Sequence, residues 1–176
     1  MTPDLDAWLP ETTLRVAHRR PSRASVDDLW RAAQEVTLSE TAVLGRLVRW
    51  RIPGVAREIT FDGLLRSPPF LVLEEGERVL VSGLVGSIWT LRRDYPQLAD
   101  PAAFHDWSRR GTARVVLASW VRETEGGSEL VAEARVQAIG AQGRVGVAAV
   151  RPVVRAFQHL IATEGLRAAV RRAEGG

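Results

Sequence analysis

Histidine is scarce in this chain, and only one of its three histidines stands where it could do acid–base chemistry. His18 follows Leu14 and Val16 on one face of an alternating stretch, so it could point into the interior, where a pKa near neutrality suits proton transfer. The competing interpretation is a histidine that bonds to backbone or lies at a rim. His105 and His159 have no carboxylate or second histidine at metal-ligand spacing, so we expect no metal site.

Other chemical signatures are missing. The chain has no cysteine, which excludes disulfides, thiolate catalysis and cysteine-ligated metals. It lacks the Gly-x-Ser-x-Gly, HExxH and Walker A motifs, and "GLVGS" (83–87) lies inside an expected strand instead of opening a helix. The adjacent carboxylates Asp27-Asp28 and Glu74-Glu75 point apart. No motif therefore assigns a reaction or a cofactor.

Small side chains along one stretch indicate empty space. In "ELVAEARVQA" (129–138) every second residue is apolar, as in a half-buried strand, and three of those five inward residues are alanines. A helix, a ligand or nothing could occupy the space above them. By the same alternation Ser119 lies with Val115, Leu117 and Val121, opposite Trp120. The tryptophans at 30, 50, 89 and 120 could line an apolar pocket, or they could simply pack the core.

The composition is that of a soluble globular protein of one domain: 176 residues, 45% hydrophobic and 26% charged. All 24 basic residues are arginines, yet they are scattered among 21 acidic residues and the net charge is only +3, so we expect no nucleic-acid partner. The N-terminus does not resemble a signal peptide, and no apolar stretch is long and continuous enough for a membrane span. We therefore expect a cytoplasmic protein.

The order of the expected elements places these residues in an α+β fold. A leader (1–12) precedes a strand at 13–20, a helix capped by Ser25, a second helix beginning near Ser39, and a short helix at 100–107. Four further strands are expected at 70–75, 78–91, 112–124 and 129–138, with turns at "EEGE" and "EGG". Gly83 and Gly86 suggest a bulge or bend in the second of these. A long C-terminal helix is expected to start near Pro152 and to kink at Gly165. Grouped strands with segregated helices favour an antiparallel sheet covered on one face.

This order, with the local pattern "HRRPSRASVDDLWRAAQEV", resembles the START-like (SRPBCC) helix-grip superfamily, which includes polyketide cyclases and dehydratases. The resemblance covers residues from about Thr13 to Arg172. It implies a curved antiparallel sheet wrapped around the long C-terminal helix, with a hydrophobic cavity between them and a single START-like domain over 13–176. Two helices are expected after the first strand, and the second lies within 39–66, where some members have only a short connection.

Under this resemblance the leading interpretation is a bacterial-type protein that binds a small hydrophobic molecule, without a cofactor and with a homodimer as a possible assembly. One alternative is a cyclase- or dehydratase-like enzyme in which His18, or a cavity Ser, Arg or Tyr95, moves a proton. Another is an interaction protein whose cavity is filled by its own side chains. The expected ligand-binding residues are His18, Trp30, Phe70, Trp89, Ser119, Ala132, Ala134, Phe157 and Ile161.

Overall fold

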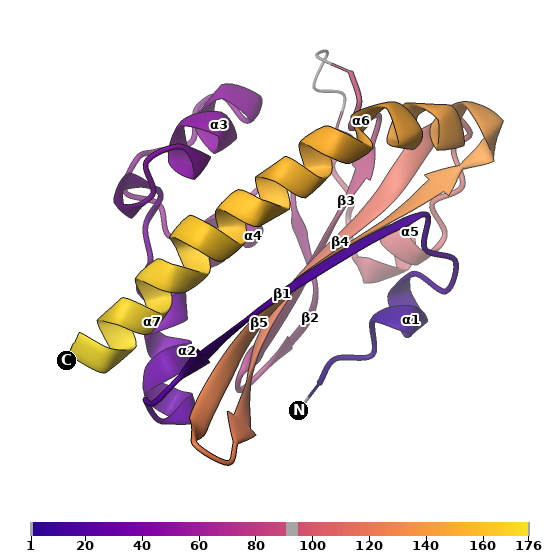
Figure 1. The fold of residues 1–176 in the computed structure, drawn as a ribbon. Coiled ribbons are helices and arrows are strands. Elements are labelled where there is room, and N and C mark those ends of the chain that lie inside the picture. Colours follow the sequence, from indigo (N-terminus) through magenta and orange to yellow (C-terminus); the bar gives the residue numbers. More distant parts are fainter. Residues whose placement is uncertain (1, 91–94, 176) are drawn as a thin grey trace.

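Five antiparallel strands form one curved sheet, and a long C-terminal helix runs across its inner face (Figure 1). The computed structural model describes residues 2–90 and 95–175. The strands lie in the order β1-β5-β4-β3-β2, so the first strand pairs with the last. This is the helix-grip arrangement of an α+β protein, as the sequence predicts. The strands are β1 (Leu14–Ser22), β2 (Leu71–Gly76), β3 (Val79–Gly86), β4 (Thr112–Thr124) and β5 (Gly127–Ile139).

The two predicted hairpins are confirmed. The β2 and β3 strands are joined at Glu77-Arg78, and β4 and β5 are joined at Glu125-Gly126. The β3 strand is shorter than the stretch 78–91 predicts, because it ends at Gly86, and residue 91 lies outside the described residues. The bulge near Gly83 lies in β2, between Val72 and Glu74.

Helix α2 (Val26–Glu35) begins as its sequence predicts. The Ser25 hydroxyl accepts a hydrogen bond from the Asp28 backbone N–H at 3.1 Å, which satisfies one of the free donors of the first turn. The helix buries Leu29 and Trp30 against the inner face of the sheet, together with Leu130 of β5. The cap therefore fixes where this apolar face meets the sheet.

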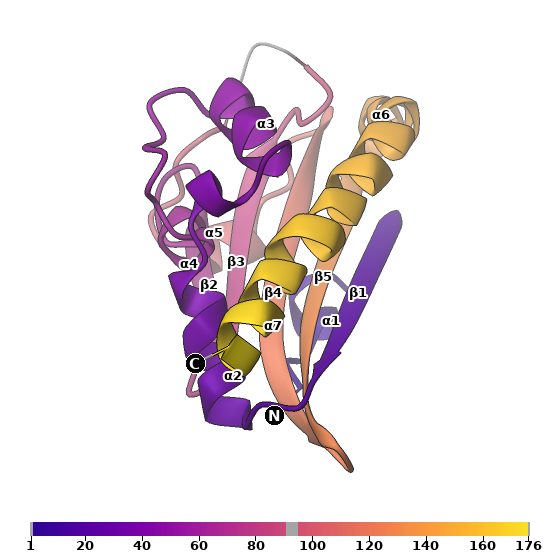
Figure 2. The ribbon, with the colours of Figure 1, turned by 60° about the vertical axis from the view of Figure 1, so that its left-hand side comes forward.

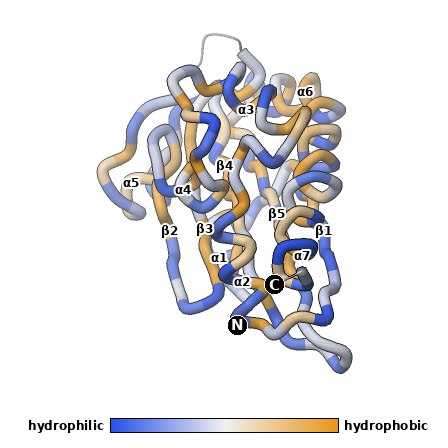
Figure 3. Tube along the Cα trace, turned by 90° about the vertical axis from the view of Figure 1, so that its left-hand side faces the viewer, coloured by the Kyte–Doolittle hydropathy of each residue, from blue (hydrophilic) through white to orange (hydrophobic). Residues whose placement is uncertain are grey.

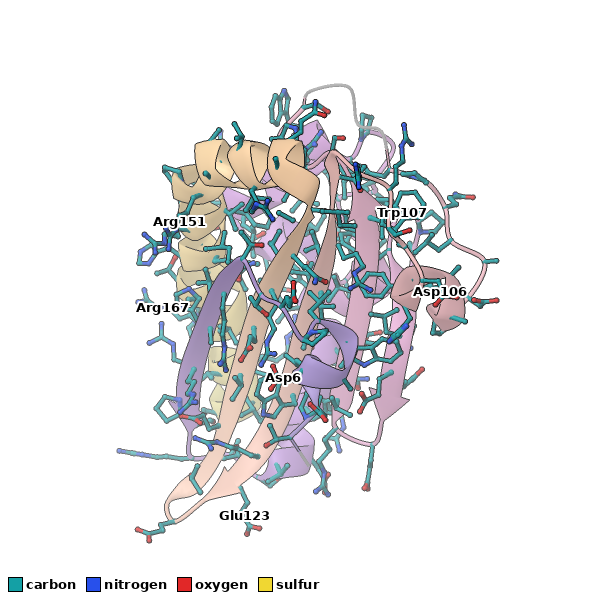
Figure 4. The ribbon with its side chains drawn as sticks, turned by 90° about the vertical axis from the view of Figure 1, so that its right-hand side faces the viewer. Asp6, Asp106, Trp107, Glu123, Arg151 and Arg167 are labelled. Carbon is teal, nitrogen blue, oxygen red and sulfur yellow. The ribbon has the colours of Figure 1, made fainter. Side chains whose placement is uncertain are left out.

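The outer face of the sheet is covered by two short helices, α1 (Leu5–Trp8) and α5 (Pro101–His105). Leu5, Leu9 and Phe104 are buried there, and Gly83 leaves room for the Phe104 ring, since a Cβ at Gly83 would lie 2.7 Å from it. Figure 4 shows α1, with Asp6, lying over the strands. Asp6 pairs with the buried Arg135, so the N-terminal leader is tied to the sheet.

The C-terminal helix begins earlier than predicted. It consists of α6 (Gly140–Leu160), a π-helical turn (Ile161–Gly165) and α7 (Leu166–Gly175), and Pro152 lies inside α6 instead of near its start. Glycines hide this start, because glycine is a poor helix former. Gly143 and Gly146 are needed for close packing: a Cβ at Gly143 would lie 2.7 Å from the Thr112 carbonyl oxygen. The predicted irregularity at Gly165 takes the form of the π turn.

The second predicted helix also begins later. Leu38–Glu40 forms a short 3-10 turn, and α3 spans Leu44–Arg51. Its cap is not Ser39, because the Glu164 carboxylate accepts hydrogen bonds from the backbone N–H groups of Val43 and Leu44 at 3.1 Å. The π turn that carries Glu164 thus holds the start of α3. A further short helix, α4 (Phe61–Leu65), follows.

The close approach at Gly146 gives a first prediction. A methyl group there would overlap the Trp89 ring, so Gly146→Ala should lower the free energy of unfolding by about 1–3 kcal/mol. Alanine's better helix propensity, worth about 1 kcal/mol, acts in the opposite direction, so a net loss isolates the clash. Thermal and denaturant unfolding measure it. Gly126→Ala, whose Cβ would meet no atom within 4 Å, is the control. A more stable Gly146→Ala protein would contradict this packing.

Candidate functional site: an apolar cavity

A cavity of about 450 Å³ lies between the inner face of the sheet and the helices α2, α3, α4 and α6. Ligand cavities typically measure about 300–1,000 Å³ and are mainly apolar, and this one falls within that range. Its walls are predominantly aliphatic and aromatic. They include Leu47, Val48, Leu64, Phe70, Leu84, Val115, Leu117, Leu130, Val136, Val154, Phe157, Leu160 and Ile161.

The space exists because small side chains cross the middle of the sheet. Ala134 of β5 pairs with Leu117 of β4, and Leu117 pairs with Ser82 of β3. One row along, Ala132 pairs with Ser119. Larger residues stand on either side of these rows, with Val136 and Val115 toward one end and Leu130 and Val121 toward the other. The inner face of the sheet is therefore recessed under the C-terminal helix.

Two buried clusters on the inner face lie at the two ends of the cavity. One contains Trp30, Leu130 and Leu166, and the other contains Leu84, Val115, Val136 and Val147. Between them, Phe157, Leu160 and Ile161 of the C-terminal helix face the floor and pack against the residues of α3 and α4. These side chains reach into the gap without filling it.

Seven of the nine residues expected from the sequence line this cavity. They are Trp30, Phe70, Ser119, Ala132, Ala134, Phe157 and Ile161. Trp89 does not: it packs under α6 at Gly146, beside the second inner cluster. Trp50 lines the cavity, whereas Trp120 lies on the outer face, opposite Ser119 as the strand alternation predicts.

His18 lies outside the described lining. It stands on β1 opposite Ala132 and under the end of α6, with Nε2 buried and without a hydrogen-bond partner in the described part of the chain. Burial lowers the pKa of His18 below its ordinary value of 6.5, and the nearby His159 lowers that pKa further.

Arg51 is a polar wall residue that sequence reasoning did not single out. It comes from the last turn of α3, and its Nη2 donates hydrogen bonds to the carbonyl oxygens of Ile88 (3.3 Å) and Thr90 (2.9 Å). Its guanidinium carbon lies 4.9 Å from the centre of the Tyr95 ring, a cation–π contact. Its Nη1 is buried and has no hydrogen-bond partner among the residues that the structure describes. Among 24 arginines, nothing in the sequence marked this one.

The remaining polar wall residues are few. Asp62 is paired with Arg66 and Glu133 with Arg135, each at 2.6 Å, and the other polar residues of the lining are Gln34, Tyr95, Ser119 and Gln158. Over residues 2–90 and 95–175, no group of three or more histidine, aspartate or glutamate side chains is arranged to hold a metal ion. The cavity is thus an apolar chamber with one cationic donor group in its wall.

Comparisons with known proteins give distant structural similarities and no family. No protein-family model matches the chain, and no curated protein matches it. Among solved structures, a hypothetical protein of Helicobacter pylori is 11% identical with a TM-score of 0.43, covering 96% of this chain and 93% of its own. The Zhui aromatase/cyclase of a Streptomyces species is 17% identical with a TM-score of 0.38, covering 93% and 98%. CalU16 of Micromonospora echinospora is 16% identical with a TM-score of 0.31, covering 92% and 83%.

The partly buried ring of His18 gives a second prediction. In a titration of the histidine ring protons by NMR, His18 should titrate below 6.5, and His159→Gln should raise its pKa without restoring 6.5, because burial is the larger cause. The lowered pKa of His18 also sets the direction in which the stability of the fold changes with pH. The contribution of neutral His18 is complete above pH 6.5 and is lost as the pH falls toward the lowered pKa. His105→Gln, at an exposed site, is the control. A His18 pKa above 6.5 would contradict the burial argument.

Proposed function

We propose that this protein binds a small, largely apolar molecule in the cavity between the sheet and the C-terminal helix. The observation that carries the proposal is the chamber of about 450 Å³ over Ala132 and Ala134. Protein interiors rarely leave voids larger than a water molecule, so a chamber of ligand size is best explained by a ligand. Its presence also speaks against an interaction protein whose own side chains fill the space. A cytoplasmic location, expected from the sequence, is part of the proposal.

We further propose that the ligand carries an acceptor oxygen, such as a carboxylate or an enolate, for Arg51. Leaving a buried charged donor without a partner costs free energy, about 1–3 kcal/mol or more. The Nη1 of Arg51 is such a donor, and the Tyr95 ring and the two carbonyl groups hold its guanidinium in place. An apolar body with one acidic or carbonyl group would match both the walls and this donor.

A cyclase- or dehydratase-like enzyme is the second candidate, and the Arg51 and Tyr95 pair favours it. Arg51 and Tyr95 both line the cavity, and the guanidinium lies over the Tyr95 ring, so a substrate carbonyl there would meet a charged donor. His18 lends it no support, since it lies outside the described lining. Binding is the function common to both candidates and is tested first.

Filling the floor of the cavity should weaken binding. Ala132→Leu and Ala134→Leu point added methyl groups into the chamber, so uptake of N-phenyl-1-naphthylamine, followed by its fluorescence, should weaken by about tenfold or more. Ala17→Leu, at an exposed position on the neighbouring strand, is the matched control and should leave uptake unchanged. Equal dye uptake by the filled variants, or none by the wild type, would refute the proposal.

The role of Arg51 is tested with two dyes that share one ring system. 1-Anilinonaphthalene-8-sulfonate is N-phenyl-1-naphthylamine with an added anionic group. Arg51→Met should weaken binding of the sulfonate about 10- to 100-fold, the worth of a charge-assisted hydrogen bond, and change binding of the neutral dye much less. Arg51→Lys should restore part of the difference. Equal losses for both dyes would mean that Arg51 acts only on the shape of the wall.

A further inference from the structure

Two helices at the mouth of the cavity expose apolar side chains on one face each. At α3, the N-cap residue Val43 and Leu47 are 39% exposed and Trp50 is 59% exposed, and their spacing of four and three residues places them on one side. On α6, Val145 is 71% exposed and Val153 is 66% exposed. Small exposed residues continue that side of α6 at Ala148, Ala149, Pro152 and Ala156. We call these two faces together the rim.

The rim surrounds the entrance to the cavity. Leu47, Trp50 and Val153 are exposed to solvent and also belong to the cavity lining, so the chamber opens between α3 and α6. Figure 2 shows that these two helices lie at the same end of the molecule. Figure 3, coloured by hydropathy, shows hydrophobic segments on α6 at this end. A body that contacts one side of the rim would therefore contact the other as well.

The charge of the rim helices is of one sign. They carry Arg46, Arg49 and Arg51 on α3 and Arg144, Arg151 and Arg155 on α6, and no acidic residue. The rest of the chain has 18 arginines against all 21 acidic residues and is net negative. On α6 the three arginines lie at spacings of seven and four residues, which forms a row beside the apolar face. Arg151 points away from the body (Figure 4). The carboxylate of Glu164, in the π turn after α6, already accepts hydrogen bonds from the backbone at the start of α3.

We propose that the rim docks on the surface of a lipid bilayer that contains anionic lipids, with the mouth of the cavity facing the bilayer. A helix with arginines beside an exposed apolar face, and a tryptophan on its neighbour, suits the interface between headgroups and acyl chains. A second copy of this chain suits it less, because a two-fold contact would bring the rim arginines of one copy against those of the other, with no acidic residue on either helix.

The length and apolarity of the C-terminal helix agree with a helix that lies on the bilayer surface rather than one that crosses the bilayer. Residues 140–175 are long and apolar enough for a span by composition, and only 17% of the most apolar window is buried. The end of this helix is nevertheless packed into the fold, because Leu166, Ala168 and Ala169 are buried against α2 and the sheet. A helix fixed in this way can lie on a bilayer but not cross it.

Vesicle sedimentation with the full chain tests the proposal. Binding to phosphatidylcholine vesicles that contain phosphatidylglycerol should exceed binding to phosphatidylcholine alone by about tenfold and should fall as salt is added. Trp50→Ser should weaken it by about tenfold. Val43→Ser with Val145→Ser should weaken it too, and because neither residue lines the cavity, uptake of N-phenyl-1-naphthylamine should be kept.

Matched charge variants separate the rim from the rest of the surface. Arg151→Gln with Arg155→Gln should reduce binding to the anionic vesicles several-fold, whereas Arg23→Gln with Arg31→Gln, at the opposite end near α2, should not. Circular dichroism confirms that each variant is folded.

Three results would overturn the proposal. The first is equal binding to neutral and anionic vesicles, or to neither. The second is binding that needs the arginines but not the apolar residues. The third is a dimer, seen by light scattering, that the Val43→Ser and Val145→Ser changes dissociate, since the rim would then be a contact between copies. Dye uptake is measured separately, so failure of docking leaves the ligand proposal standing.

Discussion

The C-terminal helix is held against the sheet at both ends and stands off it in the middle. At the start of α6, Gly143 and Gly146 allow the helix backbone to touch β4 and the Trp89 ring. At the other end, Ala168 and Ala169 of α7 bring it close to α2. Because the C-terminal helix is held at these two places over a curved sheet, the cavity lies between them. The cavity is therefore a consequence of where the small residues lie as much as of which residues line it.

The same arrangement has an energetic cost. An unfilled apolar chamber forfeits the contacts that its lining side chains would otherwise make, and the loss grows with its volume. Ser119, Ala132 and Ala134 border the chamber, so larger side chains at these positions would occupy part of it. A ligand that occupies the chamber regains those contacts and stabilises the folded state by mass action. This balance is expected of a binding protein.

Much of this fold can be predicted from local signals. Alternation defines β4 over the predicted residues, the glycine-containing turns define both hairpins, and Ser25 with Asp28 defines the start of α2. The errors lie where a distant contact overrides local preference. Three glycines hide the first half of α6, and Glu164, about 120 residues away, caps α3 in place of Ser39. The positions of Arg51 and Trp89 could not be predicted for the same reason. Tertiary packing places Arg51 in the cavity wall and places Trp89 under α6, outside the cavity.

Helix α3 links the outside of the cavity to its inside. With 3.6 residues per turn, Leu47 and Trp50 face solvent at the rim, whereas Val48 and Arg51 turn toward the chamber. The helix is only eight residues long, and its start is held by Glu164 from the π turn, which also supplies Ile161 and Gly165 to the wall. A shift of α3 against the C-terminal helix would therefore change the width of the mouth and the position of the Arg51 guanidinium together. In the proposed function, ligand entry and recognition thus depend on one small element, so the proposed contact at the rim would act directly on the proposed ligand site.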